Sequence, residues 1–273
     1  EKLEGVIFGL YAKEDILSQQ GEVLVEKDTL LEKKATDENG QITFDCDLYH
    51  GKYYVKEEVR KPGYLPNEEI WEMDASYTDQ NLAEIKLTKE VENQPTESQF
   101  TKTDATTGEE LEGAKLQIID KEGNIVEEWI SAKEPHVVYG LPEGTYILHE
   151  ELPPYAEGYV SAEDIEFEVK EDGSVTKVEM KDDYSKVEIS KTDITTGEEL
   201  EGAKLQILNK EGEILEEWVT DGKPHLAEKL PVGEELTLRE ITAPEGYEIA
   251  EDVKFTLELS LIHISEPTRL ALI

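Results

Sequence analysis

The chain has 273 residues and a formal net charge of −38, from 65 acidic and 27 basic side chains. That length allows two or three compact domains of modest size, and the charge excludes nucleic acid and anionic membranes as expected partners, because both would repel the chain. The single cysteine, Cys46, excludes an intrachain disulfide, and we interpret it as a small buried residue beside Phe44.

Residues 1–95 form the first predicted module, a diverged copy of the modules that follow. Its Leu-Glu-Gly-Val at residues 3–6 resembles Leu-Glu-Gly-Ala at residues 111–114. The added length after Ile16 predicts a loop insertion, and Pro95 marks the module boundary, because proline interrupts a central strand. By this alignment we expect the module's first strand to lie upstream of residue 1. We also expect a signal peptide and an anchor motif outside this sequence.

The next two predicted modules, residues 96–184 and 185–258, are near copies of each other. The sequence Thr-Thr-Gly-Glu-Glu-Leu-Glu-Gly-Ala-Lys-Leu-Gln-Ile is identical at residues 106–118 and 195–207. A period of 89 residues exceeds one supersecondary unit, so each copy is a small domain and the chain is a tandem array. The same offset relates two further pairs, Trp129 with Trp218 and His136 with His225.

Short segments that alternate apolar and charged residues predict strands, with the charge on the solvated face of each sheet. Such segments occur at residues 126–130, 146–148, 166–170 and 175–180. Gly-containing acidic stretches at residues 120–124, 171–174 and 209–212 predict hairpin turns. A calcium loop at Asp120 is disfavoured, because the ligand alternation of an EF-hand is missing. Evenly spaced short strands of this kind predict an all-β sandwich fold.

The repeat stops near the end of the sequence. Residues 252–258 follow residues 164–170 position by position, and the match is then lost. The string Leu-Ser-Leu-Ile-His-Ile-Ser-Glu-Pro-Thr-Arg at residues 259–269 resembles the conceptual translation of a sequencing-library adapter. We interpret residues 259–273 as a non-native tail and expect the third module to lack its last strand. A divergent final strand is the alternative.

Three polar features recur at corresponding places of the modules. They are a lysine in the opening strand, a glutamate before a corner rich in Pro, Gly and Tyr, and an acid or amide in the closing strand. The lysines are Lys102 and Lys191, the glutamates are Glu57, Glu150 and Glu240, and the closing residues are Asn93 and Asp182. Only the middle module carries all three, because the first lacks the lysine and the last lacks the closing residue.

With Lys-x-Asp, Gly-Ala and Glu-x-x-Ala-Pro-x-Gly-Tyr in one order, residues 1–258 resemble the prealbumin-like SpaA/CnaB-type domains of Gram-positive surface adhesins and pilins. The resemblance implies tandem immunoglobulin-like Greek-key sandwiches in a structural stalk of a cell-wall protein outside the cell. It also implies a self-catalysed isopeptide bond between Lys102 and Asp182, assisted by Glu150, with partial triads in the other modules. No enzyme activity on other substrates, cofactor or metal is implied. The implied partners are neighbouring modules and, through other regions, a host or matrix protein or glycan.

The physical chemistry agrees with such a triad, because burial lowers the pKa of an amine and raises that of a carboxyl group. The competing interpretation is that these are ordinary strand residues in a surface salt bridge of little consequence. An insertion at Tyr155 and Ala156 in the corner after Glu150 predicts some displacement of that glutamate.

Two further functions remain open on the sequence: a module that binds a glycan or protein through its loops, and a stalk attached to a secreted hydrolase. Trp129 and Trp218 suit carbohydrate stacking, but their place on alternating strands favours core packing. His136 and His225 recur singly, so a metal site is not expected.

Overall fold

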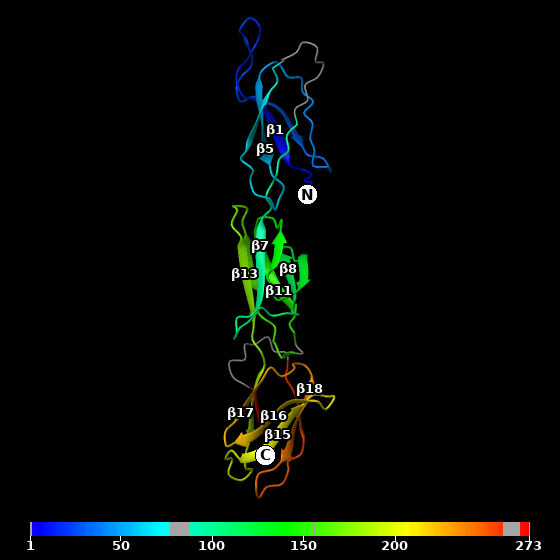
Figure 1. Ribbon diagram of the computed structural model, residues 1–273, viewed down its shortest axis with the longest axis vertical. Coiled ribbons are helices and arrows are strands. Elements are labelled where there is room, and N and C mark those ends of the chain that lie inside the picture. The colour runs from blue at the N-terminus through cyan, green and yellow to red at the C-terminus, as the bar shows by residue number, and fades with distance from the viewer. Residues whose placement is uncertain (1, 77–87, 155–156, 259–267, 273) are drawn as a thin grey trace. The chain divides into compact units, whose positions relative to one another are not determined.

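The computed structural model describes residues 2–76, 88–154, 157–258 and 268–272 (Figure 1). Within these residues the chain folds into strands, turns and loops with no α-helix, which confirms the all-β prediction. Accordingly, the described part of the chain contains no helix long and apolar enough to cross a membrane.

The chain packs into two compact units. The first comprises Glu1–Ser98, Val137–Gly144 and Glu168–Thr176, and the second comprises Gln99–His136, Thr145–Phe167 and Lys177–Ile273.

The first module builds one four-stranded sheet in the order β4-β1-β5-β6. The inserted segment after β1 forms a two-stranded hairpin, β2 with β3, where the sequence predicted only a loop. The strands are β1 (Ile7–Ala12), β2 (Ile16–Leu17), β3 (Val23–Val25), β4 (Leu30–Ala35), β5 (Lys52–Val59) and β6 (Ile70–Asp74).

The middle module builds two sheets, in the orders β10-β7-β13 and β12-β11-β8-β9. Figure 1 shows β7 beside β13, and β8 beside β11. Each strand predicted here overlaps an observed one. The strands are β7 (Glu97–Asp104), β8 (Lys115–Asp120), β9 (Ile125–Ile130), β10 (His136–Tyr139), β11 (Gly144–Leu152), β12 (Ile165–Val169) and β13 (Thr176–Asp182).

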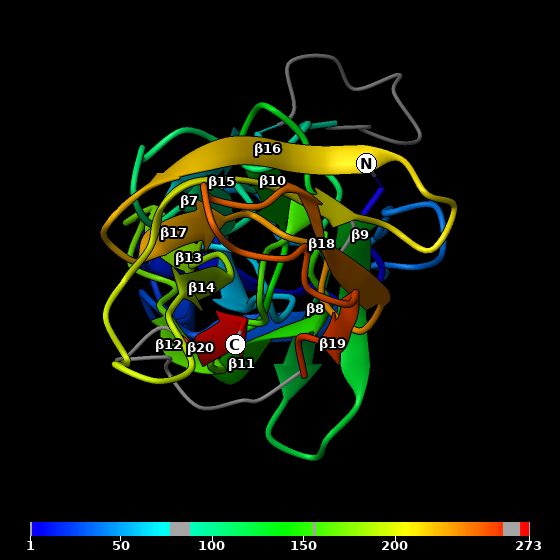
Figure 2. The same cartoon turned by 90° about the horizontal axis from the view of Figure 1, so that it is seen from below.

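The third module repeats this plan, with sheets in the orders β17-β14-β20 and β16-β15-β18-β19. Its strands are β14 (Lys186–Lys191), β15 (Glu201–Leu208), β16 (Ile214–Asp221), β17 (His225–Glu228), β18 (Glu235–Thr242), β19 (Val253–Thr256) and β20 (Thr268–Leu272). β20 runs parallel to β14 inside the segment that we interpreted as a tail (Figure 2). Most of the adapter-like string, residues 259–267, lies outside the described residues. Its origin and the module limits stay predictions.

The acidic turns form as their sequences predict. One Asp120 carboxylate oxygen accepts the backbone N–H groups of Glu122 and Asn124, at 2.9 and 2.8 Å. Gly123 has a φ of 87°, which a residue without Cβ adopts at little cost. The carboxylate of Asp120 is therefore engaged by the turn itself.

Apolar side chains of alternate positions fill the space between the sheets. In the third module the buried cluster consists of Val187, Ile189, Ala203, Leu205, Ile207, Ala227, Leu230, Val232, Leu236, Leu238 and Leu257. In the first module, half-buried Cys46 and Phe44 pack against a cluster around Leu10 and Tyr53, and burial raises the pKa of the Cys46 thiol. The cysteine thus packs as a small apolar residue, as interpreted from the sequence.

Replacing Ile207, which is fully buried, by alanine removes apolar contacts and leaves a cavity. We expect the variant to lose about 2–5 kcal/mol of unfolding free energy. Chemical denaturation followed by tryptophan fluorescence checks this. The matched control is Ile214→Ala on the neighbouring strand, where the side chain is 55% exposed and the loss should stay within about 0.5 kcal/mol. Equal losses at the two positions would contradict this description of the core.

Candidate functional site

The three candidate residues of the middle module lie inside because of strand alternation. In β7, β11 and β13 every second side chain points into the sandwich. In each strand that inward row ends on a charged residue. The rows are Ser98, Phe100, Lys102 and Asp104 in β7; Tyr146, Leu148 and Glu150 in β11; and Val178, Met180 and Asp182 in β13.

The three side chains meet in one buried cluster. The ammonium nitrogen of Lys102, Nζ, lies 2.9 Å from Oε1 of Glu150 and donates a hydrogen bond to Oδ1 of Asp182. The side chains are 1%, 0% and 0% exposed for Lys102, Glu150 and Asp182, so bulk water does not screen them. A surface salt bridge, the competing interpretation, does not describe this geometry.

Burial sets the protonation of the cluster, because two carboxylates and one ammonium would leave an unpaired buried charge. Burial, with a smaller contribution from nearby Glu150, raises the pKa of Asp182 to about 8 against the opposing charge of Lys102. At neutral pH Asp182 therefore carries its proton, which lowers the number of charges that the site buries.

A backbone group holds Glu150 in place. Its second oxygen, Oε2, accepts the N–H of Ala162 at 2.8 Å, and the glutamate pairs across the sheet with Leu116 of β8. In the third module Glu240 accepts the N–H of Ala250 and pairs with Leu205 in the same way. Glu150 thus keeps the position of its counterpart, although the insertion at residues 155–156, which lies outside the described residues, was expected to displace it.

The third module has the amine and the glutamate of the site. Nζ of Lys191 lies 3.3 Å from Oε2 of Glu240, with side chains 4% and 0% exposed. On the neighbouring strand β20, the residue opposite Lys191 is Leu272, which has neither a carboxyl nor an amide side chain. The residue that pairs with Lys191 on β20 therefore cannot form an isopeptide bond with it.

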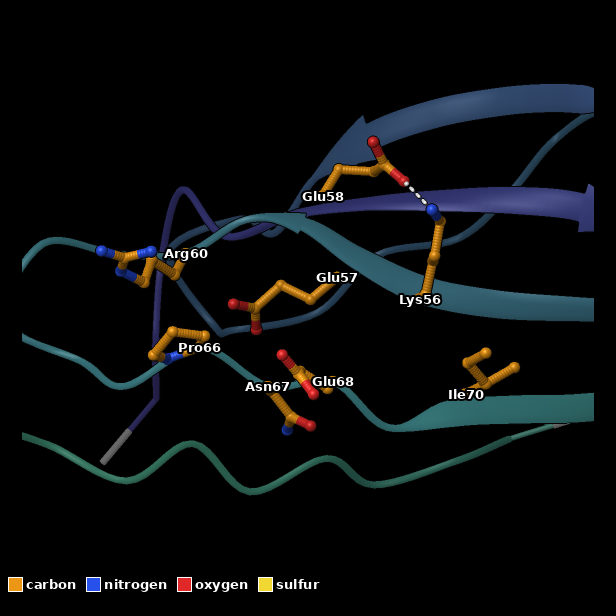
Figure 3. A pocket seen from close by; sticks show the side chains of 8 residues that line it. All are labelled: Lys56, Glu57, Glu58, Arg60, Pro66, Asn67, Glu68 and Ile70. Carbon is orange, nitrogen blue, oxygen red and sulfur yellow. Dashed lines mark ion pairs between the residues drawn. The ribbon is translucent and has the colours of Figure 1, made fainter. Parts of the chain in front are cut away.

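The first module has the other two parts of the site. The Asn93 side chain donates its N–H to Oε2 of Glu57 at 2.7 Å, and burial raises the pKa of Glu57. A pocket of about 320 Å³ opens beside this pair, lined by Lys56, Glu57, Glu58, Arg60, Pro66, Asn67, Glu68 and Ile70 (Figure 3). Its charges are mixed, and Lys56 at the rim pairs with Glu58 at 3.2 Å.

A second recurring contact was not predicted from the sequence. The hydroxyl of Tyr159 donates to Oδ2 of Asp104 at 2.7 Å, and that of Tyr247 donates to Asp193 at 2.6 Å. These are the aspartate of Lys-x-Asp and the tyrosine of Gly-Tyr in the middle and third modules. Because this aspartate and this tyrosine recur together in the sequence, the contact between them could have been predicted. The hydrogen bonds from the N–H groups of Ala162 and Ala250 could not have been predicted in this way, because every residue except proline has a backbone N–H group.

The tryptophans stack on the recurring histidines. Ring centroids lie 4.4 Å apart for Trp129 with His136, and 4.2 Å apart for Trp218 with His225. Phe100 packs against Trp129 from the core, with ring centroids 5.5 Å apart, so core packing describes Trp129 better than carbohydrate stacking. Among the described residues, no group of three His, Cys, Asp or Glu side chains is arranged to hold a metal ion.

Comparison with protein families gives a match over nearly the whole chain. The family model described as SpaA, a prealbumin-like fold domain, matches residues 1–91, 96–184 and 185–265. The match supports the prediction of tandem prealbumin-like sandwich modules. Among curated proteins, none matches.

Several solved structures are similar to the chain. The Bacillus anthracis TIE protein is 24% identical, over 100% of this chain and 48% of that one, with a TM-score of 0.47. A streptococcal ancillary pilin is 15% identical over 99% and 93% of the two chains, with a TM-score of 0.41. BcpA, the major pilin subunit of Bacillus cereus, is 15% identical over 99% and 94%, with a TM-score of 0.38. The chain spans about half the length of the TIE protein.

The protonation of Asp182 predicts a pH dependence of stability once the amine is removed. In Lys102→Met the aspartate stays buried, and its raised pKa makes the folded state bind the proton more tightly than the unfolded state. Its contribution is full below about pH 4 and is lost progressively as the pH rises toward the pKa of the folded state, which without the opposing charge of Lys102 lies above the value of about 8 in the wild type. We expect the unfolding free energy to fall by more than about 1.4 kcal/mol, the equivalent of one pKa unit, between about pH 5 and pH 8.

Denaturant titrations across this range measure the fall. The control is the double variant Lys102→Met/Asp182→Asn, which retains all other acidic residues and should lose most of the dependence. A fall of the same size in the double variant would assign the effect to other groups.

Proposed function

Since the chain belongs to the SpaA family of prealbumin-like fold domains, we propose that it is a stalk or spacer region of a bacterial cell-surface protein of the adhesin or pilin kind. In this proposal the middle module is closed by an isopeptide bond between Lys102 and Asp182, formed by the module itself with the help of Glu150. The observation that carries the proposal is the burial of this amine against both carboxyl groups.

The reaction begins with one proton transfer inside the cluster. When the Lys102 ammonium passes a proton to Glu150 across their 2.9 Å contact, the site contains a neutral amine and two neutral carboxylic acids. Net charge is unchanged, so the low-polarity interior does not oppose the step. A neutral amine is the nucleophilic form.

The amine nitrogen then attacks the side-chain carboxyl carbon of Asp182, and a C–N bond forms. Glu150 donates its proton to the departing hydroxyl and takes one from the nitrogen, so that the C–O bond breaks and one water leaves. A protonated Asp182 is the better electrophile, because no negative charge repels the incoming electron pair. Its raised pKa of about 8 therefore favours the reaction at neutral pH.

Glu150 ends the reaction as a neutral carboxylic acid, because it keeps the one proton that the Lys102 ammonium passed to it in the first step. The N–H of Ala162 fixes its second oxygen, so that Oε1 faces the amine in the geometry that both proton transfers need. Positioning of the reacting groups in this way replaces a bimolecular encounter by an intramolecular one.

The bond would change the mechanics of the module. Lys102 and Asp182 are 80 residues apart in sequence and lie on strands next to one another in one sheet. By the chain-entropy relation used for disulfides, closing such a loop stabilises by roughly 4–5 kcal/mol, which approaches the whole stability of a small domain. A pull on the two ends of the module would load the amide rather than the strand hydrogen bonds.

The remaining features of the proposal concern the setting of the chain. We infer an extracellular location at the cell wall, neighbouring modules as the immediate partners, and host or matrix ligands for other regions of the protein. The chain acts on itself in a single turnover and is not an enzyme for other substrates. Binding of a glycan through Trp129 is disfavoured, since the packing of His136 and Phe100 occupies that ring.

Intact-mass measurement of the full chain tests the bond. We expect the wild-type protein to weigh one water less than its sequence, because only the middle module has all three groups. Lys102→Ala and Glu150→Gln should restore the full mass. Fragmentation should place the missing water on a peptide that joins the segments around Lys102 and Asp182.

The third module provides the matched control, since Lys191→Ala changes an equally buried lysine. That variant should still lose one water. An unmodified wild-type mass, or loss of water that persists in Lys102→Ala, would refute the bond in the middle module.

A further inference from the structure

The corner at Gly63 contacts the beginning of the next module inside the first compact unit. The N–H of Thr96 donates to the carbonyl of Gly63 at 2.9 Å, and the N–H of Gly140 donates to the carbonyl of Thr96 at 3.0 Å. The Thr96 hydroxyl donates to the carbonyl of Leu141 at 2.7 Å. Three hydrogen bonds thus connect the corner at Gly63, the segment at Thr96 just before β7, and the turn at Gly140 and Leu141.

The same three hydrogen bonds recur inside the second compact unit. The N–H of Ser185 donates to the carbonyl of Gly158 at 2.8 Å, and the N–H of Lys229 donates to the carbonyl of Ser185 at 3.0 Å. The Ser185 hydroxyl donates to the carbonyl of Leu230 at 2.8 Å. The arrangement is therefore a repeated element, with threonine exchanged for serine.

Both contacts need a glycine on one side and a left-handed residue on the other. A Cβ on Gly63 would lie 2.2 Å from the carbonyl oxygen of Gly140, and a Cβ on Gly158 would lie 2.4 Å from the carbonyl carbon of Lys229. Gly140 has a φ of 80° and Lys229 a φ of 57°, a conformation that is unfavourable for a residue with a side chain. Backbone meets backbone at each contact.

In the second unit the side chain of Lys229 adds a further set of contacts. Its Nζ lies 3.1 Å from Oδ2 of Asp104 and 2.9 Å from the hydroxyl of Tyr159. The ammonium also lies over the rings of Tyr159 and Tyr184, 4.9 and 5.0 Å from their centroids. The Asp104 side chain is 5% exposed and that of Lys229 is 45% exposed, so a buried carboxylate meets an ammonium group that reaches it from the surface.

We propose that the Gly-Tyr corner of each module is a docking surface for the following module. The partner it fits is a module of the same kind that presents a left-handed residue followed by Leu-Pro. Glycine at the left-handed position gives a junction made by the backbone, as at Gly140. Lysine at that position adds an ion pair to the backbone contacts, as Lys229 does with Asp104.

The third module supplies the corner without a docked turn. A Cβ on Gly246 would have no atom of the described residues within 4 Å, although its φ of 87° is close to the 81° of Gly158. Tyr247 in this corner is 43% exposed, whereas the corner tyrosines Tyr64 and Tyr159 are 9% and 5% exposed. Gly158→Ala and Gly246→Ala therefore carry the same backbone strain, and only the first one clashes with a docked turn.

Hydrogen exchange of the full chain tests the docking surface. In Gly158→Ala we expect the amides of Ser185 and Lys229 to exchange about fivefold faster or more, as for the loss of one hydrogen bond. The core amide of Leu148 should keep its protection and report that the middle module is folded. In Gly246→Ala the amides of Ser185 and Lys229 should exchange as in the wild type.

Two more variants keep the test decisive if Gly158→Ala does not fold. Ser185→Ala removes the hydroxyl that bonds Leu230 and should speed exchange at Lys229. Lys229→Gly removes the ion pair with Asp104, which destabilises the junction, but glycine adopts the left-handed conformation at less cost, which stabilises it. Because these effects oppose each other, protection of the Ser185 amide should stay within about threefold of the wild type. Unchanged exchange at Lys229 in Ser185→Ala, or an equal increase at Ser185 in Gly246→Ala, would overturn the proposal. These outcomes do not depend on the isopeptide bond.

Discussion

The lysine and two carboxyl groups in the middle module share an apolar interior, and the chemistry of the site depends on that burial. In water the same three groups would be a screened ion pair with a spare charge. Inside the sandwich the spare charge is too costly, so a carboxyl group holds a proton instead. This proton converts an ion pair into a set of groups that can condense. A buried ion pair is weak evidence for stability, whereas an amide across the same positions would be a strong constraint.

The three modules hold different subsets of the same groups on one scaffold. The middle module brings Lys102, Glu150 and Asp182 together, the third brings Lys191 to Glu240, and the first brings Asn93 to Glu57. In the third module Oε2 of Glu240 contacts Lys191 and the N–H of Ala250, while its buried Oε1 has no hydrogen-bond partner among the described residues. In the first module Asn93 donates a hydrogen bond to Glu57. The fold therefore tolerates an incomplete site, and the proposed covalent bond reinforces a sandwich whose apolar core already forms without it.

The proposed isopeptide bond and the Gly-Tyr corner stabilise different parts of the tandem array. The proposed amide would work inside a module, and the Gly-Tyr corner works where one module meets the next. Asp104 takes part in the second and lies two residues from Lys102, which takes part in the first. Its carboxylate also accepts the N–H groups of Thr106 and Thr107, so the loop after β7 is ordered from within the module and from Lys229. The motif Lys-x-Asp thus places a reactive and a structural residue on one short segment.

Alternation, turn chemistry and the repeat of 89 residues were readable from the sequence, because each is a local pattern or a comparison of one segment with another. They predicted strands, turns and an all-β fold, and the recurrence of polar residues at corresponding places singled out Lys102, Glu150 and Asp182. Alternation assigns a side chain to a face of its strand, but it does not say which strand lies opposite. Only sheet order decides that a residue on β7 meets one 80 positions later on β13. The tertiary structure likewise decided that backbone N–H groups cradle Glu150 and Glu240, and that Gly158 lies against Lys229. Approaches between distant backbone segments leave no periodic trace in a sequence.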